Sequence, residues 1–394
     1  MNNREKEVLL WVEKNIFLIV FLCASLFGII IRFTLRDVIS SDSSSFLLPW
    51  YIEMKNSGGI QSLNRQIGNY NMLYQFLIAI MTYLPIPPLY AYKILSCLFD
   101  FLLAGLIGVI VYDLHNNKWE GMAGYIIVIF SPIVFLNSAA WAQCDSIYTF
   151  FSIFALFMLI KERYILAFVL LGVAFAFKLQ AIFILPVFLF VYFVRKKISI
   201  LYFVIIPVVM CALALPNIII GGRKVSDIFL VYFDQTSTYE KVSMNYPSFW
   251  NLLCDFTLDD NYTILKNIAM IFTIIILGAL MVWLLISQIN LNRRNILYIA
   301  TLLIYTVVIF LPAMHERYSY ILEILSLVLV FVERRTVFLT ITLHIMSLLT
   351  YGHVLFERDI NIYILSYINI GIYLLFVALF TSYVRKESKS SILL

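Results

Sequence analysis

The sequence predicts an all-α polytopic membrane protein, a single integral membrane domain over residues 1–394 with about twelve transmembrane helices. Of the 394 residues, 62% are hydrophobic and 13% are charged, which is about half the charged fraction of a soluble domain. The mean hydropathy is +0.94. The apolar residues also form runs without Asp, Glu, Lys or Arg, such as 267–292 and 360–384, that are long enough to cross a bilayer. This composition excludes a disordered chain, and the small net charge of +5 argues against a nucleic-acid partner.

The candidate spans are apolar runs that charged residues or turns separate from one another. In chain order they lie near 15–34, 90–112, 121–140, 146–160, 164–181, 182–194, 198–217, 264–288, 296–313, 318–332, 336–354 and 360–384. The first follows a charged start without a small-residue cleavage site, so we expect it to stay in the protein. Another apolar stretch, 72–84, is too short to span and ends in Pro85-Ile86-Pro87-Pro88, which predicts an interfacial or re-entrant helix.

The basic residues predict the orientation of these spans. With twelve crossings, the tight basic clusters all fall on one face: Lys161-Glu162-Arg163, Arg195-Lys196-Lys197, Arg293-Arg294, Arg334-Arg335 and Arg385-Lys386. The positive-inside rule places that face and both termini in the cytoplasm. Counting 72–84 as a span would put the basic N-terminus opposite these clusters. The excess of Ile, Lys and Asn over Ala and Arg is typical of an AT-rich bacterial genome, so we expect a bacterial plasma membrane.

The outer face then carries two long segments, 35–89, which we expect to contain helices on the membrane surface, and 217–263. Some polar residues are not accounted for by the charges that anchor the spans at the membrane surface, and most of these fall on the outer face. They include Asp42, Gln143, Asp145, Lys178, Gln180, His315, Glu316 and Arg317. Asp100, by contrast, lies within the second span, where hydrogen bonding to another helix is the expected role. We therefore expect any chemistry to take place at the outer face.

Two carboxylates on the outer face are candidate functional groups. Asp42 follows the first span in a serine-rich stretch, where it could act as a general base or a ligand. It could instead cap a helix that begins near Ser43. Asp145 lies between two spans and has the same two interpretations. The loop that holds Trp50 and Asn69 is rich in aromatic and amide side chains, which bind sugars but also form interfacial belts.

Three basic side chains are candidates for binding a phosphate. Lys178 ends a helix that is otherwise free of charge, and His315 and Arg317 flank Glu316 in a short turn between two apolar spans. Arg binds a phosphate with two parallel hydrogen bonds and Lys binds it as a point charge. Two of these side chains have an alternative role. Lys178 could extend its charged end to the membrane interface, and Arg317 could pair only with Glu316 or anchor the span near 318–332 at the interface.

The segments that contain these candidate residues resemble those of polytopic glycosyltransferases of the GT-C fold, in particular bacterial proteins related to the mannosyltransferases of GPI-anchor assembly. The resemblance rests on Ser41-Asp42, Phe46-Leu47-Leu48-Pro49-Trp50-Tyr51, Asn69-Tyr70-Asn71, Gln143-Cys144-Asp145-Ser146-Ile147-Tyr148, Phe175-Ala176-Phe177-Lys178-Leu179-Gln180 and Pro312-Ala313-Met314-His315-Glu316-Arg317-Tyr318. It implies a GT-C-like fold with a large first outer loop. It also implies a sugar donor linked to a polyprenyl or dolichyl phosphate, used at the outer face with inversion at the anomeric carbon.

The resemblance further implies site residues. Asp42 matches the base, which removes a proton from the acceptor hydroxyl of a glycan or glycolipid. Lys178, His315 and Arg317 would then meet the charge that grows on the leaving lipid phosphate. The remaining candidates for substrate binding or support are Trp50, Asn69, Gln143, Asp145 and Gln180. The sequence shows no metal-ligand spacing, although Asp42 and Asp145 could share a divalent metal.

Two other classes of function remain open from the sequence alone. A transporter or flippase of a lipid-linked saccharide would share the polytopic fold and the outer polar residues. Such a protein needs polar groups deep in the membrane, and the spans contain few charges apart from Asp100 and Glu323. A scaffold in a cell-wall assembly complex would leave Asp42 and the His315–Arg317 turn unexplained.

Overall fold

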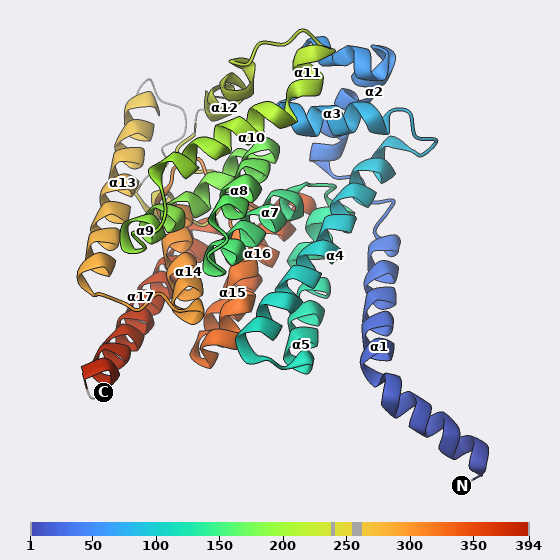
Figure 1. Ribbon diagram of the computed structural model, residues 1–394. Coiled ribbons are helices and arrows are strands. Elements are labelled where there is room, and N and C mark those ends of the chain that lie inside the picture. The colour runs from blue at the N-terminus through green and yellow to red at the C-terminus, as the bar shows by residue number, and fades with distance from the viewer. Residues whose placement is uncertain (1, 238–240, 254–261, 393–394) are drawn as a thin grey trace.

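The computed structural model describes residues 2–237, 241–253 and 262–392, and these residues form helices without a β-strand (Figure 1). The helices of the first half are α1 (Asn3–Thr34), α2 (Leu48–Asn56), α3 (Met72–Met81), α4 (Pro88–His115), α5 (Lys118–Ile129), α6 (Pro132–Phe135), α7 (Asp145–Ile160), α8 (Tyr164–Phe177) and α9 (Leu185–Val194). The others are α10 (Ile205–Leu213), α11 (Leu215–Ile219), α12 (Asp227–Ser237), α13 (Tyr262–Ile286), α14 (Arg293–Phe310), α15 (Tyr320–Val332), α16 (Val337–Leu355) and α17 (Ile362–Ile392). The predicted all-α class is confirmed.

Long apolar helices also confirm the polytopic membrane character. Among the described residues, six helices have the length and composition to cross a membrane, and a seventh span arises if one bent pair is counted. They are α1, α4, α13, α14, α16 and α17, with α5 and α6 in the bent pair. The other five predicted spans are apolar helices of 10–17 residues, and their crossing stays a prediction. The excluded stretch 72–84 forms the ten-residue helix α3.

The predicted span 121–140 is bent because it contains Ser131-Pro132. Proline has no N–H for the helix, and the residue before it favours extended backbone; Ser131 has φ −62° and ψ 122°. The two halves, Lys118–Ile129 and Pro132–Ala140, meet at 47°. The second half ends in a π-helical turn, Leu136–Ala140, and the chain then turns back into α7. This bend brings the residues after 140 to one end of the bundle.

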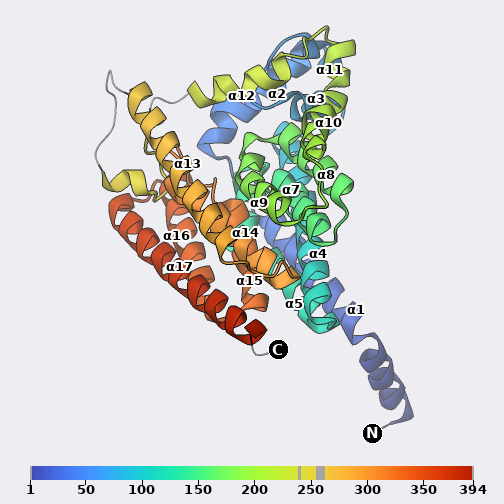
Figure 2. The same cartoon turned by 60° about the vertical axis from the view of Figure 1, so that its left-hand side comes forward.

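The predicted outer segments lie together at one end of the molecule. In Figures 1 and 2, α2, α3, α11 and α12 form the upper end, whereas α1 begins and α17 ends at the lower end. Three hydrogen bonds among the described residues join the segments. Asn71 Nδ2 donates to the Ile228 carbonyl (3.0 Å), Arg223 Nη2 donates to Gln66 Oε1 (3.3 Å), and Gln235 Nε2 donates to the Asn69 carbonyl. Residues 238–240 and 254–261 of the second segment lie outside the described residues. That the lower end is cytoplasmic stays a prediction.

Cysteine labelling tests this orientation. Single cysteines at Asn56, an exposed residue in the first predicted outer segment, and at Asn290, an exposed residue before α14, are introduced into a cysteine-free variant. We expect a membrane-impermeant maleimide to label Asn56→Cys in intact cells and Asn290→Cys only after the membrane is opened, because the basic clusters remain inside. Labelling of both positions in intact cells would contradict the topology.

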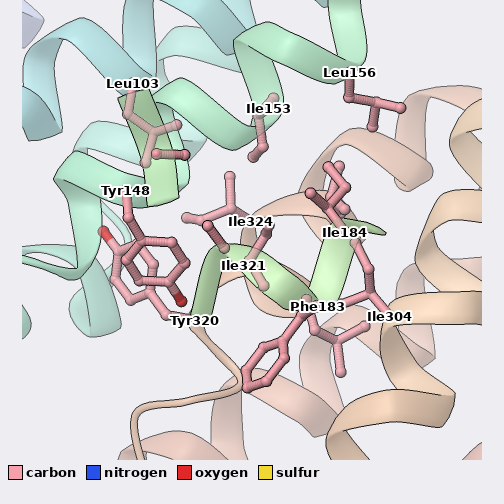
Figure 3. Packing of buried hydrophobic residues seen from close by; sticks show 14 of the residues in the cluster. Leu103, Tyr148, Ile153, Leu156, Phe183, Ile184, Ile304, Tyr320, Ile321 and Ile324 are labelled. Carbon is pink, nitrogen blue, oxygen red and sulfur yellow. The ribbon is translucent and has the colours of Figure 1, made fainter. Parts of the chain in front are cut away.

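A densely packed core holds the upper ends of several helices in place. Every residue of α14 from Asn295 to Phe310 is buried. Figure 3 shows apolar side chains from α4, α7, α14, α15 and the 3-10 turn Leu179–Ile184 in contact with one another, among them Leu103, Ile153, Ile184, Ile304 and Ile324. The start of α7, the residue after α8 and the turn between α14 and α15 are therefore parts of one rigid unit.

A buried ion pair ties α1 to this unit. Arg32 Nε donates to Asp100 Oδ2 at 2.8 Å, and the Ser138 hydroxyl donates to the same oxygen. The side chains of Arg32 and Asp100 are almost fully buried. The predicted interhelical bonding of Asp100 is confirmed. An unpaired charge here would be very costly, so the pair fixes the end of α1 that leads to the first outer segment.

Candidate active site

Asp42 lies directly before a π-helical turn, Ser43–Leu47, and its side chain makes no capping bond to that turn. Instead, Asp42 Oδ2 accepts hydrogen bonds from Trp141 Nε1 (3.0 Å) and Gln143 Nε2 (2.9 Å). Arg317 Nη1 lies 3.3 Å from the same oxygen. About a quarter of the Asp42 side chain is exposed (23%). The capping role is therefore excluded, and the carboxylate is held by residues about 100 and 275 positions away in the chain.

The local backbone on both sides of this contact is unusual. A second π-helical turn, Leu136–Ala140, directly precedes Trp141. Such turns are rare in proteins, and those that occur are often found at functional sites. Ala142 has a φ of 62°, a left-handed conformation that costs energy for a residue with a Cβ. It turns the chain so that Trp141 and Gln143 both reach Asp42. This strain is maintained by the surrounding fold.

Asp145 and Lys178 form a buried ion pair next to Asp42. Asp145 is the first residue of α7, and Lys178 follows the end of α8 in extended backbone (φ −154°, ψ 139°). Lys178 Nζ donates to Asp145 Oδ1, and Asn137 Nδ2 donates to Asp145 Oδ2 at 2.9 Å. The exposed fractions of the Lys178 and Asp145 side chains are 7% and 0%. Lys178 therefore does not snorkel, because its charge is neutralised inside the protein.

The turn between α14 and α15 supplies Arg317. Its Nη1 donates to Glu316 Oε1 at 2.8 Å besides contacting Asp42, and its Nε lies 3.9 Å from Asp145 Oδ2. The Nε group is buried and has no hydrogen-bond partner in the part of the chain that the structure describes. A residue outside the turn anchors it: the carbonyl of Val242 accepts a hydrogen bond from the N–H of Ala313, which belongs to the turn (2.7 Å). Arg317 thus contacts three carboxylates, not Glu316 alone.

His315 lies in the same turn but does not carry the positive charge expected of it. Burial and the nearby Arg317 charge lower the pKa of His315 to about 3, so the imidazole is neutral at physiological pH. The ring packs against Tyr318, with centroids 5.0 Å apart. Of the three predicted phosphate ligands, Lys178 and Arg317 are therefore cations and His315 is a neutral imidazole that can form hydrogen bonds. That these three residues bind a phosphate stays a prediction.

A cavity of about 210 Å³ opens beside these groups. Its polar lining includes five of the residues predicted from the sequence: Asn69, Lys178, Gln180, His315 and Arg317. Its apolar lining includes Ile182, Phe183, Met270, Leu311 and Met314. Asp42, Gln143 and Asp145 do not line the cavity, but each contacts a residue that does. Asp42 contacts Arg317, Asp145 contacts Lys178, and Gln143 accepts a hydrogen bond from Tyr70. One space therefore has cationic, neutral polar and apolar walls.

Trp50 lies one layer further from the cavity. Its ring contacts Tyr70 edge-on, with centroids 5.9 Å apart, and the Tyr70 hydroxyl donates to Gln143 Oε1 at 3.2 Å. Gly68, with a φ of 73°, packs on the Trp50 ring, and a Cβ there would lie 2.6 Å from Trp50 Cδ2. Trp50 therefore supports Tyr70, which in turn holds Gln143 against Asp42.

Sequence reasoning assigned no role to Trp141, Asn137 or Tyr70. Trp141 and Asn137 lie close in the chain to Gln143 and Asp145, and Tyr70 follows Asn69, which is the only signal that could have found them. Their contacts to Asp42, Asp145 and Gln143 depend on how distant segments pack. In the ranges that the structure describes, no three His, Cys, Asp or Glu side chains group as metal ligands.

Comparison with known proteins places the chain in a family. A sequence model of glycosyltransferase family 87 matches residues 69–312, which is more than half of the chain. The matched region contains Gln143, Asp145 and Lys178 and ends just before His315, whereas Asp42 precedes it. No curated protein matches the chain.

Proposed function

The chain belongs to glycosyltransferase family 87, a GT-C-type family of polyprenyl-phosphate-sugar glycosyltransferases, and we propose how its site transfers the sugar. The donor is a hexose, such as mannose, on a polyprenyl phosphate. The acceptor is a lipid-linked or cell-envelope glycan, and the reaction takes place at the outer face of the plasma membrane with inversion. Membership of an enzyme family favours catalysis over the scaffold and flippase alternatives.

The observation that carries this proposal is the direct contact between a carboxylate and the cation of a neighbouring cavity. Asp42 lies 3.3 Å from Arg317, which lines the cavity together with Lys178. In the proposed reaction Asp42 accepts the proton of the acceptor hydroxyl, whose oxygen bonds to the anomeric carbon. The bond from that carbon to the phosphate oxygen breaks, and the lipid phosphate leaves with the electron pair. Base and leaving group then lie on opposite faces of the sugar, which produces inversion.

Lys178 and Arg317 have hydrogen-bond donors left for the phosphate. Lys178 has three N–H donors, of which one goes to Asp145, and the buried Nε of Arg317 has no hydrogen-bond partner among the described residues. Three carboxylates, Asp42, Asp145 and Glu316, form ion pairs with these two cations in the structure. A bound phosphate would accept hydrogen bonds from the donors that these carboxylates leave free. His315, being neutral, contributes a hydrogen bond and not a charge.

The apolar wall of the cavity suits a donor that remains attached to a lipid. Ile182 and Met270 line the cavity and are 41% and 37% exposed. Apolar side chains beside a phosphate-binding group match a molecule with a charged head and a hydrocarbon tail. A soluble nucleotide sugar would gain nothing from this wall.

Sugar transfer by the purified protein in proteoliposomes tests the function. The donor is radiolabelled mannosyl polyprenyl phosphate, and the bilayer contains a panel of glycolipid acceptors. We expect label in a glycolipid and release of polyprenyl phosphate, with no label transferred from a soluble nucleotide sugar. Movement of the donor across the bilayer without sugar transfer would instead support the flippase alternative and contradict the proposal.

A further inference from the structure

Trp141 is fully buried, and the only polar atom of its side chain, Nε1, forms a hydrogen bond with the candidate base. Its indole N–H donates to Asp42 Oδ2 at 3.0 Å, and Gln143 and Arg317 approach the same oxygen. In the described part of the chain no residue donates to the other oxygen, Oδ1. The carboxylate is therefore bound on one side and open on the other.

The contact between Trp141 and the Asp42 segment runs in both directions. The hydroxyls of Ser40, two residues before Asp42, and Ser43, directly after it, donate to the Trp141 carbonyl at 3.3 and 3.2 Å. The indole ring is also held from the side by Tyr351, whose ring meets it at 88° with centroids 5.0 Å apart. The Trp141 backbone therefore cannot move without breaking contacts to the Asp42 segment, and its ring cannot move without breaking the contact to Asp42 itself.

The face of the same indole carries the cation. Arg317 Cζ lies 5.3 Å from the ring centroid, a distance at which a guanidinium is attracted to the indole π-system. Trp141 thus contacts Asp42 through its edge and Arg317 through its face. These are the two groups that must be placed correctly relative to each other if one removes a proton while the other receives a phosphate.

We propose that Trp141 is a positioning residue for the reaction, a role that rests on the proposed function of Asp42 and Arg317. Its N–H fixes Oδ2, so that Oδ1 is the atom that accepts the proton. Its ring face holds the guanidinium beside the cavity. The N–H contact acts on the chemical step, and the ring contact acts on binding of the lipid phosphate.

Two substitutions separate these contacts. Trp141→Phe keeps an aromatic face and removes the N–H, and Trp141→Leu removes both. The matched control is Trp250→Phe, because Trp250 is also buried and its N–H donates only to a backbone carbonyl, that of Phe310 (2.5 Å), away from Asp42. The measurements are kcat and donor KM with mannosyl polyprenyl phosphate, and the thermal shift caused by polyprenyl phosphate.

We expect Trp141→Phe to lower kcat by about tenfold to hundredfold with little change in the thermal shift, because a hydrogen bond to a charged group is lost. Trp141→Leu should also reduce the thermal shift, and Trp250→Phe should keep the wild-type kcat. Wild-type kcat in Trp141→Phe would overturn the inference, as would equal losses in Trp141→Phe and Trp250→Phe.

Failure of the inference is distinguishable from failure of the function. A wild-type protein without transferase activity would contradict the proposed function, whereas an active wild type with an unaffected Trp141→Phe would contradict only the role of Trp141. If Trp141→Phe does not fold, a double variant, Ser40→Ala with Ser43→Ala, frees the Trp141 carbonyl and leaves the indole intact. We expect a severalfold lower kcat with unchanged KM, and an unchanged kcat would overturn the inference.

Discussion

Asp42→Asn is expected to lower sugar transfer by about a thousandfold or more, which is within the range of general base catalysis. The amide keeps the shape of the carboxylate, and its oxygen can still accept from Trp141 and Gln143. It cannot accept the proton of the acceptor hydroxyl. The measurement is the initial rate of transfer from mannosyl polyprenyl phosphate in proteoliposomes, together with the thermal shift caused by polyprenyl phosphate, which should persist.

Asp37→Asn is the matched control for this variant. Asp37 lies in the same segment, is mostly exposed, and pairs with Arg36 at the surface, where ion pairs contribute little. We expect Asp37→Asn to transfer sugar at nearly the wild-type rate. An Asp42→Asn protein with a rate near that of wild type would refute the base assignment, because a residue that only supports the fold would survive so small a change.

The membrane helices were predictable because each is a continuous local pattern. All twelve predicted apolar runs are helical, and the short stretch 72–84 forms only α3. The helix lengths were less predictable, since several runs are divided by features that act over one or two residues. Ser131-Pro132 bends one run by 47°, and Lys178 in extended backbone separates α8 from the turn that follows. The sequence also gives no sign that Arg32 would pair with Asp100.

The members of the site were more predictable than their contacts. Asp42, Lys178 and Arg317 stand out in the sequence as charged residues beside apolar spans. That Trp141 and Arg317 both hold Asp42 depends on two turns and a bent helix, none of which has a periodic pattern. The neutral state of His315 follows from its burial and from the Arg317 charge, two properties of the packed site. A charge count along the chain therefore overestimates the positive charge available to a phosphate.

Arg317→Ala is expected to weaken binding of polyprenyl phosphate by about tenfold to hundredfold, the value of a hydrogen bond to a charged group. Arg317 lines the cavity together with two other cations, Lys178 and Lys266, and its buried Nε has no hydrogen-bond partner among the described residues. Arg317→Lys should also bind less well, because an ammonium cannot replace the planar guanidinium with its several donors. The measurement is the thermal stability of each variant as a function of polyprenyl phosphate concentration.

The control for this series is Arg65→Ala, since Arg65 also pairs with a carboxylate, Glu53, at 3.1 Å, but lies exposed in the first predicted outer segment and does not line the cavity. We expect its ligand-induced stabilisation to match wild type. Loss of Arg317 also leaves Asp42 and Glu316 without their shared cation, so the melting temperature of the unliganded variant should fall. A variant that is less stable but is stabilised by polyprenyl phosphate as much as wild type would show that Arg317 only neutralises these carboxylates. The phosphate would then have to bind through the other cations of the cavity wall, Lys178 and Lys266.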